Sequence, residues 1–212
     1  GSKTNKVENE QCEQVGKILA LLHQETLDFN EKRKNNMDYQ QWQNIYQKCK
    51  NQNNNQYKNI MIAVEKELEF LKKKWPINLP EGIIHADVFQ DNVFFKDNKF
   101  SGLIDFYFAC NDFFSYDIAL TVNAWCFNSS FYFEKKKFLH LISGYESIRK
   151  ITDDEKNVFS ILLRGASLRI LLTRIHDILF QTENAFVENK DPGEYFSILT
   201  FHQKNDIFKY LK

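Results

Sequence analysis

The segment from Gly82 to Asn92 contains the residue types and spacings best suited to chemistry. It holds the pattern His-x-Asp-x-x-x-x-Asn, formed by His85, Asp87 and Asn92, and Asp105 follows thirteen residues later. Phosphoryl transfer to a hydroxyl needs such a set. One carboxylate orients the hydroxyl and takes its proton, while another carboxylate and an amide oxygen hold the Mg²⁺ that bridges nucleotide phosphates. The spacing therefore favours a kinase-type site.

The surroundings of this pattern decide between catalysis and its alternative, a coincidental polar turn. Short apolar or aromatic runs at 82–85, 92–95 and 100–106 predict strands, and Asp97-Asn98 predicts a turn between the last two. A loop between strands can bring Asp87 and Asn92 together. The returning strand can then place Asp105 beside them, which favours catalysis.

Helices are expected to carry this small β region. Apolar residues at helical spacing predict helices at 8–29, 40–50, 57–74, 115–127, 131–149, 153–181 and 193–210. Asp153-Asp154 is expected to cap the sixth of these and make its first turn negative. The predicted fold class is mainly α with a small β-hairpin region.

Composition excludes several classes of protein. The 212 residues are 43% hydrophobic and 15% aromatic, which excludes global disorder. Lys plus Arg equals Asp plus Glu at 28 each, so we expect neither nucleic acid nor an anionic membrane as a partner. No apolar run reaches membrane-span length. The four cysteines form no C-x-x-C motif, so we expect reduced thiols and a cytoplasmic location.

A family resemblance covers the chain from about Val15 onward. The pattern from His85 to Asn92 and the later Asp105 resemble the catalytic and metal-binding loops of the aminoglycoside phosphotransferase family, which has the protein-kinase-like fold. Further matching segments are Gly102–Cys110, Tyr116–Ala119, Asn123–Phe127, Leu163–Arg169, Leu172–Arg174, Asp191-Pro192 and Leu199–His202. These segments are most similar to the bacterial branch of the family that phosphorylates homoserine to O-phosphohomoserine, a step in threonine biosynthesis.

The resemblance implies a role for each matching residue, with ATP and Mg²⁺ as cofactors. Asp87 would be the catalytic base, and Asn92 and Asp105 would hold Mg²⁺. Asp117 would accept hydrogen bonds from the catalytic-loop backbone, and His85 would brace that loop rather than shuttle protons. The sequence reads Asp-Phe-Tyr at 105–107 instead of the Asp-Phe-Gly of protein kinases, which weakens any inference of a flipping activation loop.

The sequence lacks a phosphate-gripping loop. Neither G-x-G-x-x-G nor G-x-x-x-x-G-K-[ST] occurs in it, and the resemblance implies that this grip lies in a separate N-terminal lobe. We therefore expect residues 15–212 to be the helical C-terminal catalytic lobe alone, with its catalytic and metal loops at 82–110. Residues 1–14 would be a purification-tag scar and lead-in. The isolated chain is expected to fold without catalysing, its missing lobe being a partner.

Arginines mark candidate contacts to the substrate. The chain has few Arg, yet Arg164, Arg169 and Arg174 lie in one apolar helix. A guanidinium can bind the carboxylate of homoserine with two parallel hydrogen bonds. Steps of five residues rotate by about 140° on an α-helix, so the three cannot share one face. The substrate-binding candidates are Arg169, Arg174, Asn123, Trp125 and His202, with a structural role left open for Arg169 and an ion pair to Asp177 left open for Arg174.

Three functions remain open at this point. The first is ATP-dependent phosphorylation of the homoserine hydroxyl. The second is the same chemistry on another small alcohol, such as an aminoglycoside, choline or a thiosugar. The third is a non-catalytic helical interaction module, since half of the ATP site is absent from the sequence. A module of that kind would not need Asp87, Asn92 and Asp105 at these spacings.

Overall fold

The computed structural model describes residues 7–52, 55–180 and 190–211, and these form a mainly helical fold with two small antiparallel sheets. The helices are α1 (Asn9–Glu25), α2 (Tyr39–Asn51), α3 (Lys58–Lys74), α4 (Phe114–Trp125), α5 (Lys135–Glu146), α6 (Asp153–Phe180) and α7 (Pro192–Lys204). The strands are β1 (Glu81–Ile84), β2 (Val93–Lys96), β3 (Lys99–Leu103) and β4 (Cys110–Phe113). The predicted fold class is confirmed. No helix within the described residues is long and apolar enough to cross a membrane.

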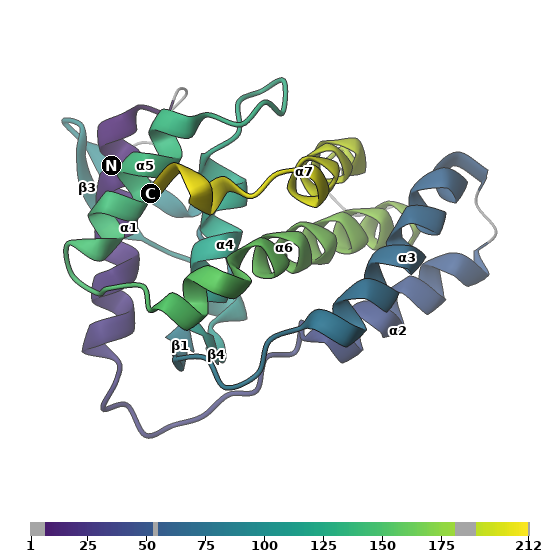
Figure 1. Ribbon diagram of the computed structural model, residues 1–212, viewed down its shortest axis with the longest axis horizontal. Coiled ribbons are helices and arrows are strands. Elements are labelled where there is room, and N and C mark those ends of the chain that lie inside the picture. Colours follow the sequence, from purple (N-terminus) through teal and green to yellow (C-terminus); the bar gives the residue numbers. More distant parts are fainter. Residues whose placement is uncertain (1–6, 53–54, 181–189, 212) are drawn as a thin grey trace.

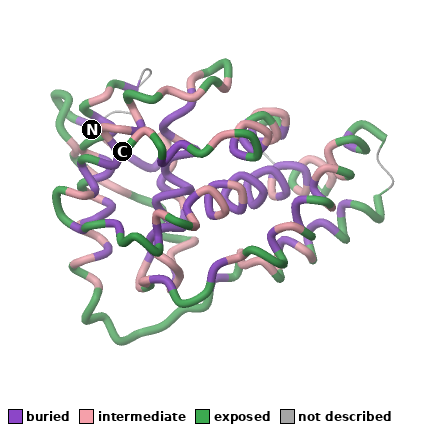
Figure 2. The backbone as a smooth tube through the Cα atoms, viewed as in Figure 1, coloured by how far each residue is buried: buried purple, intermediate pink, exposed green. Residues whose placement is uncertain are grey.

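Helix α6 is the central element of the molecule. It crosses the fold between α7 on one side and the α2–α3 pair on the other (Figure 1), and it also packs against α4. Apolar residues occupy nearly all of its faces, which is the pattern of a buried helix, and Figure 2 shows burial along most of its length. Residues on α6 can therefore reach several parts of the core.

The start of α6 differs from the prediction. Thr152 Oγ1 accepts a hydrogen bond from the Glu155 N–H at 3.3 Å, and the Glu155 carboxylate accepts one from the Thr152 N–H at 2.9 Å. This reciprocal pair is a capping box with Thr152 as the N-cap. The prediction of Asp153-Asp154 as the cap was therefore wrong, although both residues lie in the first turn as expected.

Helices α1 and α5 touch backbone to backbone at two glycines. A Cβ atom on Gly16 would lie 2.0 Å from the Leu141 carbonyl oxygen, and one on Gly144 would lie 1.9 Å from the Glu13 carbonyl oxygen. Only residues without a side chain permit this approach. The close contact fixes α1 against α5 and thereby fixes the position of His23 near the end of α1.

Two sheets frame the segment from 81 to 113. Strands β2 and β3 form the predicted hairpin, and Asp97 and Asn98 at its turn have φ values of 52° and 59°. Two successive positive φ values are typical of the type I′ turn favoured in hairpins. Strand β1 pairs instead with β4, from Glu81 opposite Phe113 to Ile84 opposite Cys110.

Strand β4 was not predicted, and the third predicted strand, 100–106, ends earlier, at Leu103. The β1–β4 pairing joins the start of the first candidate loop to the end of the second. Both loops thus emerge from one pair of strands, which holds their side chains near each other.

The four cysteines are buried in different parts of the fold and form no disulfide. Cys12 lies on α1, Cys49 on α2, Cys110 on β4 and Cys126 directly after α4. Burial raises the thiol pKa to about 12 for Cys12 and Cys110 and to about 11 for Cys49, and well above its usual range for Cys126. These thiols are therefore protonated and inert in the folded protein.

Candidate active site

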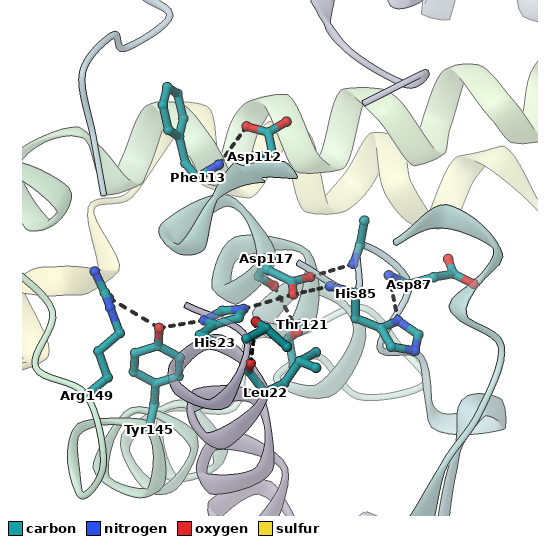
Figure 3. A network of polar contacts seen from close by, with 12 residues as sticks. Leu22, His23, His85, Asp87, Asp112, Phe113, Asp117, Thr121, Tyr145 and Arg149 are labelled. Carbon is teal, nitrogen blue, oxygen red and sulfur yellow. Dashed lines mark hydrogen bonds and ion pairs between the residues drawn. The ribbon is translucent and has the colours of Figure 1, made fainter. Parts of the chain in front are cut away.

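The loop after β1 is held by a carboxylate from α4. Asp117 is completely buried, and its two oxygens accept hydrogen bonds from the backbone N–H groups of His85 and Ala86, each at 2.8 Å (Figure 3). This is the contact to the loop backbone that the family resemblance implies. It leaves the next residue, Asp87, at the mouth of the loop, where its carboxylate is only partly buried.

Ala86 has an unusual backbone conformation and is restrained from two sides. Its φ is 62°, in the left-handed region that costs a non-glycine residue about 1–2 kcal/mol. Asp117 binds its N–H, and Arg169 on α6 donates from Nη1 to its carbonyl oxygen at 2.8 Å. Strained residues of this kind persist where the surrounding structure restrains them and cluster at functional sites. The two contacts together set the direction in which Asp87 leaves the backbone.

Asn92 joins the two candidate loops. Its Nδ2 donates to the Asp87 carbonyl oxygen at 2.9 Å and to the Asp87 carboxylate at 3.0 Å. The Asn92 carbonyl oxygen accepts from the Ile104 N–H at 3.0 Å, so that Asp105 follows directly. With the side-chain nitrogen occupied, the Asn92 Oδ1 is the atom left to bind a cation.

Asp105 itself is exposed and also adopts a left-handed backbone, with φ at 63°. Its carboxylate accepts a hydrogen bond from the Tyr107 N–H at 3.3 Å. This short turn aims the carboxylate away from the protein interior.

His85 binds both loops through its two ring nitrogens. Its Nδ1 accepts from the Asp87 N–H at 3.2 Å, and its Nε2 lies 3.1 Å from the Ile104 carbonyl oxygen. An accepting Nδ1 places the ring proton on Nε2, which then donates to Ile104. The ring also contacts Phe106 at a centroid distance of 4.5 Å. With both nitrogens occupied, this geometry fits a brace.

The charges around the loop favour a base at Asp87 and an anion at Asp117. Burial raises the pKa of Asp87, although Arg169 and then His85 act in the opposite direction. Burial would also raise the pKa of Asp117, but the hydrogen bond from His23 and those from the loop outweigh it and the pKa is lowered. A carboxylate with a raised pKa is the better proton acceptor.

His23 connects Asp117 to a buried polar chain. Its Nε2 lies 3.1 Å from the Asp117 carboxylate, and its Nδ1 lies 2.7 Å from the Tyr145 hydroxyl (Figure 3). Arg149 donates to that hydroxyl at 3.2 Å and to Glu155 at 3.0 Å. Burial lowers the pKa of His23, so the neutral ring donates to Asp117 and accepts from Tyr145.

The sequence analysis did not anticipate this set of buried polar contacts, in which His23 is fully buried. Its one sequence signal is a histidine directly beside the apolar stripe of its helix, where a buried polar group needs a partner.

A cavity of about 220 Å³ lies at the mouth of the two loops. Its lining residues are Asp87, Phe89, Asp91, Asn92, Asp105, Ile170, Thr173, Arg174 and Lys190. The structure thus gathers the predicted base and both predicted metal ligands in one place, together with Arg174. The contributions of Phe89, Ile170 and Lys190 were missed, because aromatic and aliphatic residues and single lysines carry no motif.

Three predicted substrate residues lie in the core instead of the cavity. Trp125 is fully buried, and its indole donates to the Val88 carbonyl oxygen at 2.7 Å. Asn123 donates to Ser167 and to the Leu163 carbonyl oxygen, and its Oδ1 lies 2.8 Å from the His202 Nε2. Their polar atoms are used in packing α4, α6 and α7 together. Asn123, Trp125 and His202 thus lie outside the cavity lining, and their geometry fits packing roles better than contact with a substrate.

The three arginines of α6 point to three different partners, as their spacing predicts. Arg164 pairs with Glu67 through Nε at 2.6 Å and Nη2 at 2.7 Å. Arg169 is 2% exposed and binds Ala86, so of the two roles left open for it the structure supports the structural one. Arg174 pairs with Glu194 at 2.5 Å, and the alternative of an ion pair with Asp177 was wrong.

The residues at the mouth suit a hard divalent cation. Asn92 and Asp105 offer an amide oxygen and a carboxylate, the oxygen ligands that Mg²⁺ prefers, and Mg²⁺ commonly completes its shell with water and substrate phosphates. In the part of the chain that the structure describes, no three His, Cys, Asp or Glu side chains converge into a metal-binding cluster. A site of few protein ligands fits Mg²⁺ better than zinc.

Comparison with known proteins assigns the family. The sequence pattern of the Phosphotransferase enzyme family matches residues 2–150, more than half of the chain. The chain belongs to this family. Among its relatives, the homoserine kinase of Sinorhizobium medicae is 42% identical over 203 residues, and that of Bartonella tribocorum is 46% identical over 190 residues. These alignments cover 96% and 90% of this chain but 62% and 60% of the relatives, so the chain spans about three fifths of their length.

Solved structures of phosphotransferases confirm the fold. An amicoumacin kinase in complex with AMP-PNP, Ca²⁺ and Ami superposes with a TM-score of 0.68 at 15% identity, over 100% of this chain and 67% of its own. A spectinomycin phosphotransferase in complex with ADP and spectinomycin superposes with a TM-score of 0.63 at 15% identity, over 98% of this chain and 66% of its own. At this identity the likeness concerns the fold alone.

Proposed function

We propose that the full-length protein transfers a phosphoryl group from ATP to the hydroxyl of L-homoserine, giving O-phosphohomoserine. The observation that carries this proposal is the cavity that Asp87, Asn92 and Asp105 line together. The substrate follows from relatives that are homoserine kinases at 42% and 46% identity. Because the chain covers only part of those relatives, the activity is assigned to the whole protein.

In this proposal Asp87 acts as the base. Its carboxylate, held by the Asn92 amide, orients the acceptor hydroxyl and takes its proton as the oxygen attacks the terminal phosphorus. The raised pKa of Asp87 strengthens this proton transfer. Asn92 and Asp105 would hold Mg²⁺, which supplies neutralisation of the phosphate charge when bound. Asp117, His85 and Arg169 keep the loop in position.

The grip on the nucleotide phosphates is proposed to lie in an N-terminal lobe of the same protein. The 212 residues contain no glycine-rich phosphate loop. Phosphoryl transfer depends on holding the phosphates in line with the acceptor, so residues 15–212 alone would fold without turnover. The expected cytoplasmic location stays a prediction.

The alternatives are less well supported. Relatives that are homoserine kinases at 42% and 46% identity favour homoserine over an aminoglycoside. Choline lacks the carboxylate that Arg174 and Lys190 of the lining could bind. A purely structural module would gain nothing from the convergence of Asp87, Asn92 and Asp105.

A coupled ADP-release assay on the full-length protein tests the proposal. L-homoserine should support turnover far better than an aminoglycoside, choline or a thiosugar. Asp87→Asn should lower kcat by at least about 100-fold, whereas Asp28→Asn, at an exposed position outside the cavity, should leave kcat unchanged. Absence of homoserine-dependent ADP release, or a normal kcat in Asp87→Asn, would contradict the proposal.

A further inference from the structure

The cavity contains two cations that the phosphoryl-transfer chemistry does not use. Asp87 serves the acceptor hydroxyl, and Asn92 and Asp105 serve the metal. The remaining charged groups of the lining are Arg174, Lys190 and Asp91. Resting on the proposed function, we infer that Arg174 and Lys190 form the subsite that binds the carboxylate of the amino-acid acceptor and so select it over alcohols without a carboxylate.

Arg174 is a rigid and partly desolvated cation. Its side chain is 10% exposed, and its guanidinium lies 4.5 Å from the centre of the Tyr195 ring. Nη1 donates both to Glu194 at 2.5 Å and to the Asp191 carbonyl oxygen at 2.8 Å. A cation immobilised in this way loses little conformational freedom when it binds an anion.

Arg174 keeps donors available for a ligand. A guanidinium has five N–H donors in a planar fork, and the contacts of Arg174 to Asp191 and Glu194 both use Nη1. Within the described residues, Nε and Nη2 make no hydrogen bond. These two nitrogens form the edge of the guanidinium that can bind a carboxylate with two parallel hydrogen bonds.

Lys190 is brought to the same cavity by the contact that holds Arg174. The Asp191 carbonyl oxygen binds Arg174, so the preceding residue lies at the cavity. Lys190 Nζ lies 3.2 Å from the Asp91 carboxylate with more than half of its side chain exposed, so it can move to an incoming anion at little cost.

The other α6 arginines do not compete for this role. Arg169 is 2% exposed and bound to Ala86, and Arg164 is bound to Glu67 through two nitrogens. Neither lines the cavity. Arg174 is therefore the arginine of α6 that an acceptor in contact with Asp87 can reach.

The test compares two acceptors in the full-length protein. L-homoserine carries the carboxylate, whereas 3-amino-1-propanol keeps the hydroxyl and the amine and lacks it. The wild type should favour homoserine in kcat/KM by about 10- to 100-fold, the range for charge-assisted hydrogen bonds. Arg174→Met should lower kcat/KM for homoserine by a similar factor, mainly through KM, and change that for 3-amino-1-propanol by less than about twofold. Arg174→Lys should restore part of the preference.

Lys190→Met gives a second readout that folding cannot obscure, because the side chain is exposed. Lys190→Met should also lower kcat/KM for homoserine more than for 3-amino-1-propanol. Arg164→Met and Lys204→Met serve as matched controls outside the cavity. Equal losses for both acceptors, or a wild type that does not distinguish them, would overturn the inference. If both variants turn over homoserine with an unchanged preference over 3-amino-1-propanol, the subsite alone is refuted. If the wild type does not turn over homoserine at all, the proposed function is refuted and the subsite with it.

Discussion

Replacement of Arg169 by Met should loosen the loop that carries Asp87 and lower the stability of the fold. The side chain is 2% exposed and donates to the Ala86 carbonyl oxygen at 2.8 Å. Methionine fills much of the volume but leaves this buried acceptor without a partner, which costs about 1–3 kcal/mol. At about 2–4 °C per kcal/mol for a chain of this size, the melting temperature should fall measurably.

The same change should lower kcat. Ala86 pays about 1–2 kcal/mol for its left-handed backbone, and Arg169 is one of its two restraints. If loss of this restraint lets the loop adopt a conformation more stable by about 1–2 kcal/mol, the productive position of Asp87 becomes about 5- to 30-fold less populated. The kcat of the full-length protein should fall by a similar factor.

The pH profile of kcat/KM distinguishes the effect of the Arg169 charge on Asp87 from its effect on the position of Asp87. Arg169 opposes the burial that raises the pKa of Asp87. Its removal should raise that pKa further, and since a base works only above its pKa, the acidic limb of kcat/KM should move to higher pH. Arg169→Lys keeps the charge and should leave the limb in place while still lowering kcat.

Arg164→Met, which breaks an ion pair with Glu67 away from the loop, should lower stability without moving the limb. An unchanged kcat and an unmoved limb in Arg169→Met would refute this reasoning.

Two further predictions concern the metal and the isolated chain. Asp105→Ala in the full-length protein should sharply raise the Mg²⁺ concentration needed for half-maximal rate, because a hard cation loses its carboxylate; an unchanged Mg²⁺ titration would exclude Asp105 as a ligand. The 212-residue chain should show a cooperative thermal melt but no homoserine-dependent ADP release, because the phosphates are not gripped. Robust turnover by this chain alone would show that no further lobe is needed.

The sequence predicted those features that depend on local pattern. The helices follow from apolar periodicity, and the hairpin follows from Asp97-Asn98, whose backbone suits a tight turn. The convergence of Asp87, Asn92 and Asp105 follows from strands that flank a short loop. These signals come from short, neighbouring stretches of the chain, where spacing limits the possible structures.

Features that depend on distant pairing escaped prediction. Strand β4 forms because β1 lies opposite it, and its own residues, Cys110 to Phe113, show no clear alternation. Arg169 and Arg174 look alike in sequence, yet one binds the Ala86 carbonyl oxygen and the other lines the cavity. Their roles depend on what α6 packs against at each turn, which helical periodicity does not specify.

The four buried cysteines allow local opening of the fold to be measured by chemical labelling. Each thiol lies in a different part of the fold, and each is at most 4% exposed with a raised pKa. A thiol-alkylating reagent can therefore react only when the surrounding element opens, so the labelling rate at each cysteine measures the local opening equilibrium. Cys110 would report on the β1–β4 strand pair next to the candidate site, Cys12 on the α1–α5 contact and Cys49 on the α2–α3 pair. Mass spectrometry of timed labelling would thus resolve the order in which the elements of this chain open, without the introduction of any new cysteine.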